Sequence, residues 1–372
     1  PSHACLSAFG AILAAKVQPV PPRTMTSLLA NHHLSVSLVV FLVAAALIGV
    51  FGVRMTYLAR DLALATGLGE AVVGAVLIGA TTSLSGIIAS ATAAWHGQAS
   101  LAVSNSLGGI AAQTLFLVLG DALYRKSNLE FAAASVENLM MSVQLMVLLC
   151  ILFIAFTVPG LSVFSVHPLS LLLILAYVFM VKLLVDTHEK PMWLPRMSRG
   201  TVREGRPRRK RGPRGHATSR LMLAFAACAA VVALAGWMMA GSGMVIVERT
   251  GLSAGIVGGI FIAVATSLPE LVVAVTAIRA GALTLAVGDI VGGNAFDTLF
   301  VAISDIFYRD GPIYSAIADT ERVWLGSAML MNSVLLMGLM YRERRGIANI
   351  GMESALILVV YVVTVGYLAG GT

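Results

Sequence analysis

The feature that most limits the fold of this chain is its division into ten apolar runs, most of them about the 20 residues that a helix needs to cross a bilayer. Only 12% of the residues are charged and 58% are hydrophobic, whereas a soluble domain carries about 25% charged residues. We therefore expect an all-α integral membrane protein with ten transmembrane helices. The runs lie near residues 34–53, 67–94, 99–123, 138–158, 165–186, 221–246, 252–278, 282–308, 322–341 and 350–369.

Two stretches fall outside these runs. Residues 1–33 contain several prolines and few charges, and we expect a disordered N-terminal extension rather than a cleaved signal peptide, because a basic leading region is missing. Residues 187–220 are rich in Arg, Gly and Pro, which is typical of a disordered linker. The expected domains on either side of this basic linker are a first five-helix repeat at 34–186 and a second at 221–372.

The basic residues are unequally distributed between the two sides of the membrane. If the linker is cytoplasmic, the remaining inside loops carry most of the Arg and Lys, which follows the positive-inside rule. The formal net charge of +7 then reflects topology rather than a nucleic-acid-binding patch. We expect a cell-membrane protein, in a bacterial inner membrane, with both termini outside. The inside residues are Arg54, Arg60, Arg125, Lys126, Arg279, Arg342, Arg344 and Arg345, and the outside ones are Arg249, Arg309 and Arg322.

The two groups of five runs are copies of one another. Without a gap, residues 66–125 align with 250–309 at an offset of 184, and 24 of the 60 positions are identical. The shared segments include TGL, TSL, LAV and TLF, and also Asp121 with Asp305, which we expect to cap helices or pair with Arg. Because each copy has an odd number of spans, the copies are inverted, as in many duplicated transporters.

Polar residues are concentrated in two apolar runs of the second copy, between Ala263 and Phe300. A carboxylate at membrane depth is costly unless it has a partner, a proton, an ion or water. A proline and several glycines interrupt the same runs, and broken helices near the midplane form the cation sites of many transporters. We therefore predict a cation site here. The polar residues are Thr266, Ser267, Glu270, Asp289, Asn294 and Asp297.

The motifs ATSLPEL at 265–271 and GDIVGGNAFDTLF at 288–300 resemble the second alpha-repeat of sodium/calcium exchangers, in the cation/calcium antiporter superfamily. The resemblance covers about residues 34–370. It implies a site for Ca²⁺ and Na⁺ between the two inverted repeats. The ligands that it implies are Thr266, Ser267, Glu270, Asn294 and Asp297 in the second repeat, and Thr82, Ser83 and Gln113 in the first.

The first repeat departs from the family pattern. Ser85-Gly86 stands where Pro-Glu is expected, and Ile110 stands where the second repeat has Asn294. Only Glu270 and Asp297 remain as charged ligands, enough to neutralise one divalent ion. Ca²⁺ prefers six to eight oxygen ligands, so neutral oxygens must supply the rest. We expect fewer transported ions, weaker affinity, or protons as the exchanged ion.

Several of these residues have structural alternatives. The hydroxyls of the two Thr-Ser pairs are alternatively bonded back to the preceding helical turn. Asn294 alternatively braces a broken helix, and Gln113 forms a hydrogen bond between helices. Asp289, near the start of its run, is alternatively a solvated helix-end residue.

The function expected is secondary antiport, moving Ca²⁺ or a related cation in exchange for Na⁺ or H⁺. The alternatives are a Na⁺/H⁺ or K⁺/H⁺ exchanger on the same fold, or a cation-binding membrane protein that does not transport. The sequence contains no intramembrane pair of histidines, no metalloprotease motif and no nucleotide motif. We therefore expect neither an enzyme nor a cofactor, with inorganic cations and the lipid bilayer as partners and no nucleic acid or nucleotide.

Overall fold

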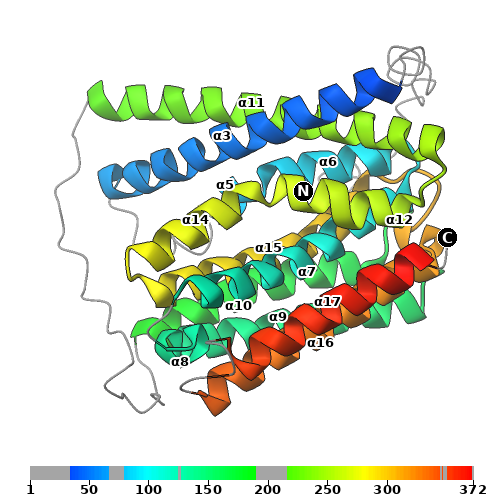
Figure 1. Ribbon diagram of the computed structural model, residues 1–372. Coiled ribbons are helices and arrows are strands. Elements are labelled where there is room, and N and C mark those ends of the chain that lie inside the picture. The colour runs from blue at the N-terminus through cyan, green and yellow to red at the C-terminus, as the bar shows by residue number, and fades with distance from the viewer. Residues whose placement is uncertain are drawn as a thin grey trace, which may run out of the picture.

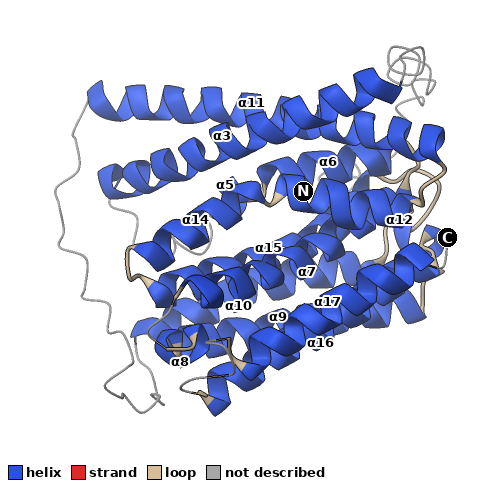
Figure 2. Ribbon diagram, in the orientation of Figure 1, coloured by secondary structure: helices blue, strands red, loops and turns tan. Residues whose placement is uncertain are grey.

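The computed structural model describes residues 34–66, 79–124, 127–189, 216–343, 346 and 350–370. Nearly all of these residues are helical, and the β structure among them is one isolated bridge between Val163 and Val166 (Figure 2). The expected N-terminal extension and most of the expected linker lie outside the described residues.

The described part of the first repeat begins with α3 and ends with α10. Its elements are α3 (Leu34–Thr66), α5 (Gly79–Thr82), α6 (Leu84–Trp95), α7 (Ala99–Leu123), the short α8 (Leu129–Ala133), α9 (Val136–Thr157) and α10 (Pro168–Glu189).

The second repeat follows the same order from α11 to α17. Its elements are α11 (His216–Thr250), α12 (Ala254–Ile256), the π-helix η2 (Val257–Ile262), α13 (Ala263–Thr266), α14 (Leu268–Arg279), α15 (Leu283–Phe307), the 3₁₀ helix η3 (Ile313–Ala316), α16 (Asp319–Tyr341) and α17 (Met352–Gly370).

By length and composition, eight of the described helices can cross a membrane, and a bent pair makes a further span. This pair joins Ala254–Thr266 to Leu268–Arg279 at an angle of 47°. The second expected span, 67–94, is described only from residue 79, where α5 and α6 follow one another. These elements are consistent with ten spans. Helix α10 continues to Glu189 and α11 begins at His216, so helix extends a few residues into each edge of the expected linker.

Helices α3 and α11 run side by side across one face of the bundle, whereas α7 and α15 lie in its middle (Figure 1). In their most apolar stretches, 94% of α7 and 78% of α15 is buried within the protein, against 22% of α3 and of α11. A helix surrounded by protein on all sides can place polar side chains away from lipid. The fold therefore puts the polar residues of α7 and α15 where a site can form.

Helix α7 crosses η2 with the two backbones in contact. A Cβ atom at Gly108 would lie 2.6 Å from the carbonyl carbon of Gly259. This approach, which small residues allow, joins α7 of the first repeat to the second repeat just before its broken helix. The π-helix is a rare element that frequently occurs at functional sites.

Two buried aspartates join the ends of the repeats. Asp305 accepts hydrogen bonds from the amide groups of Ile313 (2.8 Å) and His167 (2.7 Å) and from the Ser170 hydroxyl (2.7 Å). We call Asp305 with these partners the Asp305 clasp. It ties α15 to the start of α10 in the other repeat.

The equivalent cluster around Asp121 is related by the same offset of 184. Asp121 accepts from the amide groups of Leu129 (2.7 Å) and Gly351 (2.8 Å), and Ser354 is a further partner. This Asp121 clasp ties α7 to the start of α17. The expected structural role of both aspartates is confirmed, and their partners here are backbone amides and serine rather than Arg.

Candidate cation site

The site begins at two equivalent breaks between short helices. Helix α5 ends at Thr82 and α6 begins at Leu84, while α13 ends at Thr266 and α14 begins at Leu268. The residues between them have similar backbone angles, φ −81° and ψ 0° at Ser83, and φ −93° and ψ 8° at Ser267. Pro269 explains the second break, because proline cannot donate to the preceding turn. The first break forms without a proline, so it belongs to the shared architecture.

The two serines at these breaks each face a polar residue of the opposite repeat. Ser83 Oγ donates to Asp297 Oδ1 at 2.8 Å. Gln113 Nε2 donates to Ser267 Oγ at 3.1 Å. Because Gln113 and Asp297 occupy equivalent positions, these two bonds are related by the internal repeat. They bring both breaks to the central pair of helices, α7 and α15.

Gln113 and Asp297 also contact each other directly. Gln113 Nε2 donates to Asp297 Oδ2 at 2.6 Å, so Nε2 is shared between the two partners in the second repeat. Ser106 Oγ donates to the Asp297 backbone carbonyl at 2.6 Å, which fixes α15 against α7 at this level. Both side-chain oxygens of Asp297 therefore accept hydrogen bonds from uncharged groups.

Glu270 lies in the first turn of α14 and is 1% exposed. The Thr82 hydroxyl donates to its carboxylate, and Asp297 is close enough for the two carboxylates to repel each other. Within the described residues, Glu270 Oε2 is buried and has no hydrogen-bond partner. A buried carboxylate oxygen of this kind requires an explanation, such as a proton, a water or a cation.

Two amide oxygens share this property. In the part of the chain that the structure describes, Gln113 Oε1 and Asn294 Oδ1 are buried without partners. Asn294 Nδ2 donates to Thr114 Oγ1 at 3.0 Å, so its amide nitrogen braces α15 against α7 while its oxygen stays available. Both alternatives considered for Asn294, bracing and ligation, are thus compatible with its geometry.

The Thr266 hydroxyl is used differently. It donates to the carbonyl of Ile262 at 2.9 Å and lies 3.2 Å from that of Ala263, within its own helix. This is the bonding to the preceding turn that the sequence offered as the alternative to ligation. The structure therefore places Thr266 at the break but not with its hydroxyl free.

Asp289 is the residue whose interpretation changes most. Its Oδ2 is buried and without a hydrogen-bond partner among the described residues, so a fully solvated helix-end position is wrong. It is also close enough to Glu270 for repulsion between their charges. At the equivalent position of the first repeat, Asn105 donates to the Gly86 carbonyl at 3.2 Å, beside the first break.

The site lacks a dense cluster of charged ligands. Across the described ranges, no three His, Cys, Asp or Glu side chains are grouped so that they could hold a metal ion. Any cation bound here depends on two carboxylates together with neutral hydroxyl and amide oxygens. Such a mixed set of oxygens suits Ca²⁺ or Na⁺ rather than a metal that prefers nitrogen or sulfur.

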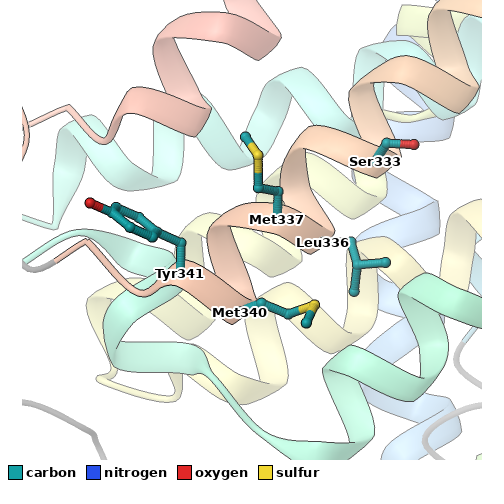
Figure 3. A pocket seen from close by; sticks show the side chains of 5 residues that line it. All are labelled: Ser333, Leu336, Met337, Met340 and Tyr341. Carbon is teal, nitrogen blue, oxygen red and sulfur yellow. The ribbon is translucent and has the colours of Figure 1, made fainter.

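A separate open hollow lies on the outer face of α16 (Figure 3). Met337, Met340 and Tyr341 are each more than 40% exposed there, and the Ser333 hydroxyl donates back to the Met329 carbonyl. An apolar hollow on the outside of a membrane helix has few polar groups to bind an ion. It is not part of the cation site. Its lining residues are Ser333, Leu336, Met337, Met340 and Tyr341.

Comparison with known protein families shows to which family this chain belongs. The family described as sodium/calcium exchanger protein matches residues 36–185 and 220–370, which are the two repeats. The chain belongs to the sodium/calcium exchanger family. This exchanger is 26% identical over 310 residues to the putative antiporter CaxA of Alkalimonas amylolytica, with 83% of this chain and 91% of that protein covered.

Solved structures share the fold of this exchanger. The sodium-calcium exchanger NCX_Mj superimposes with a TM-score of 0.55 at 17% identity, covering 90% of this chain and 99% of that one. The H⁺/Ca²⁺ exchanger CAX superimposes with a TM-score of 0.59 at 12% identity, covering 95% and 94%. The expected architecture of two inverted repeats in a membrane is thereby confirmed. The family consists of cation antiporters rather than enzymes, and the exchanger is accordingly a cation antiporter.

Proposed function

We propose that this exchanger moves Ca²⁺ across the membrane in exchange for Na⁺ or H⁺, with Glu270 and Asp297 as the charged ligands. The observation that carries the proposal is a set of buried oxygens on α14, α7 and α15. Glu270 Oε2, Gln113 Oε1 and Asn294 Oδ1 have no partner among the described residues, although burial of an unpaired polar oxygen is unfavourable. A cation between the repeats would satisfy all three.

The chemistry of these groups fits a hard cation. Ca²⁺ takes six to eight oxygens at flexible geometry, and the two carboxylates, two amide oxygens and the hydroxyls of Thr82, Ser83 and Ser267 are sufficient. The side chains that donate to the two carboxylates, Ser83, Gln113 and Thr82, are neutral, so the negative charge is left to be balanced by an ion. Support also comes from relatives whose names describe sodium-calcium and H⁺/Ca²⁺ exchange.

The helices outside the core suggest how access alternates. Helix α3 meets the second break through glycine, since a Cβ at Gly52 would lie 2.5 Å from Pro269 Cγ. Because Gly52 has no side chain to interlock with Pro269, α3 can slide over α14 at this contact. We propose that α3 and α11 move together over the core, exposing the site to one side of the membrane and then to the other.

We also propose that the protein lies in a bacterial inner membrane, with the linker cytoplasmic and both termini outside.

The test is uptake of radioactive Ca²⁺ into proteoliposomes with an outward gradient of Na⁺ or of H⁺ imposed separately. Wild-type protein should accumulate Ca²⁺ with at least one gradient, and Glu270→Gln should abolish the uptake. Glu248→Gln, the same change at an exposed carboxylate of α11, is the matched control and should transport normally. Absence of uptake by the wild type under both gradients would exclude Ca²⁺ exchange.

A second candidate, Na⁺/H⁺ or K⁺/H⁺ exchange, is favoured by one observation. Gly86 occupies the position in the first repeat that corresponds to Glu270, so a symmetric second glutamate is missing. The same vesicles, loaded with a pH-sensitive dye, distinguish the two functions. Na⁺- or K⁺-dependent proton movement that requires Glu270 and ignores Ca²⁺ would establish the second candidate.

A further inference from the structure

Position 86 in α6 is where the first repeat would present its counterpart of Glu270. The offset of 184 that relates the repeats places Gly86 on Glu270, and both residues lie three positions after the serine of a helix break. Both residues are buried. A side chain at position 86 would therefore point into the protein from the equivalent turn of the equivalent helix.

The Phe300 ring occupies the space that this side chain would need. A Cβ atom at Gly86 would lie 2.9 Å from Phe300 Cζ and 3.4 Å from Cδ2, and nearer still to Cε2. Carbon atoms in favourable contact are about 3.5–4.0 Å apart. Only glycine fits at position 86 while Phe300, itself 3% exposed, keeps its place.

Two further aromatic rings hold Phe300 in this position. Phe296 packs edge-on against Phe300 with 6.5 Å between ring centroids, and Tyr177 of α10 packs edge-on against Phe296 at 5.6 Å. Such edge-to-face arrangements are favourable beyond the area that they bury. The three rings form a continuous stack from the outer helix α10 to the cation site.

Among the described residues, the positions equivalent to these three rings do not form a stack. Residue Tyr361 corresponds to Tyr177, and Phe116 corresponds to Phe300, but Ala112 stands in place of Phe296. Without a middle ring, Tyr361 packs instead near Trp324, with centroids 6.3 Å apart. Among the described residues, the stack thus forms where the phenylalanine covers a glycine, and it joins Tyr177 of the first repeat to Phe296 and Phe300 of the second.

We propose that Phe300, positioned by Phe296 and Tyr177, is a specificity-determining residue that excludes a second glutamate and restricts the site to the charge of Glu270 and Asp297. This inference rests on the proposed function, because it concerns how many cations that site binds. Two carboxylates neutralise one Ca²⁺ or two Na⁺, and a third Na⁺ would leave a net positive charge buried in the protein. With Glu270 and Asp297 as the charged ligands, and with Asp289 near Glu270 but not a ligand, the exchanger binds one Ca²⁺ against no more than two monovalent ions.

The steric part is tested by a thermal-stability cycle on purified protein, independently of transport. Gly86→Ala should lower Tm by on the order of 5 °C in the wild-type background, because overpacking is destabilising. In a Phe300→Ala background the same change should cause no further loss. The matched control is a Phe116→Ala background, where Gly86→Ala should be as destabilising as in the wild type. An equal loss in all three backgrounds would overturn the exclusion.

The ion count is tested by equilibrium titration of Na⁺ against bound radioactive Ca²⁺ in detergent. Displacement by Na⁺ should be steeper in Gly86→Glu/Phe300→Ala than in the wild type or in Phe300→Ala alone, with about one more Na⁺ needed to remove Ca²⁺. Unchanged steepness, or a wild type that already requires more than two Na⁺, would overturn the restriction. If the wild type binds neither ion, the proposed function and the ion count both fail, whereas the stability cycle still decides whether Phe300 excludes a side chain.

Discussion

The two clasps and the cation site differ in how closely the internal repeat is kept. In the clasps, Asp121 and Asp305 bind the same kinds of partner at equivalent positions, two backbone amides and a serine hydroxyl each. At the site, Gly86 and Gln113 of the first repeat stand at the positions equivalent to Glu270 and Asp297 of the second. The aspartate and the serine are the same in both clasps, whereas the equivalent residues of the cation site differ chemically.

The difference follows from what each region must satisfy. Amide groups at helix ends need an acceptor wherever they are buried, and the inverted copies present the same amides at both ends of the molecule. An ion at a shared axis requires only that the total charge and number of oxygens suffice. One repeat can therefore supply the charge while the other supplies neutral partners.

The largest expected effect is the loss of Ca²⁺ uptake when Asp297 is replaced, and an exchange with its counterpart Gln113 should reverse part of that loss. Asp297→Gln removes one of two carboxylates and should reduce Ca²⁺ uptake by at least about 100-fold, since even indirect changes around a metal cost 10–100-fold. The exchange Gln113→Asp/Asp297→Gln returns a carboxylate to the same pair and should restore part of the uptake, measured in proteoliposomes. If Gln113→Asp/Asp297→Gln is as inactive as Asp297→Gln, the carboxylate must lie on α15. In that case the position of the negative charge matters, and not only the total charge of the site.

Gly108 and Gly292 occupy equivalent positions in the two repeats but are packed differently. Gly108→Ala would drive a methyl group into the Gly259 backbone and should destabilise the protein by about 2 kcal/mol. At the equivalent Gly292, a Cβ would meet Met141 S at an ordinary 3.6 Å, so Gly292→Ala should leave Tm unchanged or slightly raised. Thermal melting followed by a dye in detergent measures both. Similar losses at the two positions would show that the repeats pack alike here.

The clasps should respond alike to the same change. Asp305→Asn leaves one acceptor oxygen but places an amide group against N–H donors, and should destabilise by about 1.5 kcal/mol, the range for hydrogen bonds to a charged group. Asp121→Asn should have an effect of the same sign and similar size. Melting temperatures of the two variants test the equivalence, and Asp319→Asn at an exposed helix start is the control. A large effect at one clasp alone would contradict the common role.

Much of this molecule could be predicted from local signals in the sequence. Apolar runs and the gapless repeat predicted the membrane fold. The proline, glycines and carboxylates of the second repeat predicted a broken helix there, with Glu270 and Asp297 as ligands. The break at Ser83, which has no proline, was not predicted. Contacts between distant residues could not be predicted. The Phe300 ring over Gly86, the buried Oδ2 of Asp289 and the amide partners of the clasps depend on packing between repeats, which neither hydropathy nor residue spacing encodes.

The smallest change in stability is expected from the residues beside the two clasps, which differ between the repeats. Beside the Asp305 clasp, Tyr314 is hydrogen-bonded to Ser170 at 2.9 Å, and Leu169 is apolar. The equivalent residues beside the Asp121 clasp are Glu130 and Glu353, both fully buried. In the described part of the chain, Glu130 Oε2 and both carboxylate oxygens of Glu353 lack hydrogen-bond partners.

Replacing the buried Glu353 by an apolar residue should make the protein more stable. Glu353→Leu places at position 353 the apolar residue that Leu169 provides beside the Asp305 clasp. It should stabilise the protein by about 1 kcal/mol, because it removes one of two buried carboxyl groups, Glu130 and Glu353, that contact and repel each other. The reverse change, Leu169→Glu, should destabilise by more, as it buries a new charge beside Tyr314. Melting temperature is the measurement, with Ca²⁺ uptake as the control for an intact site. A loss of stability in Glu353→Leu would mean that Glu353 has a role that packing does not explain, and that the clasps diverged for function as the cation site did.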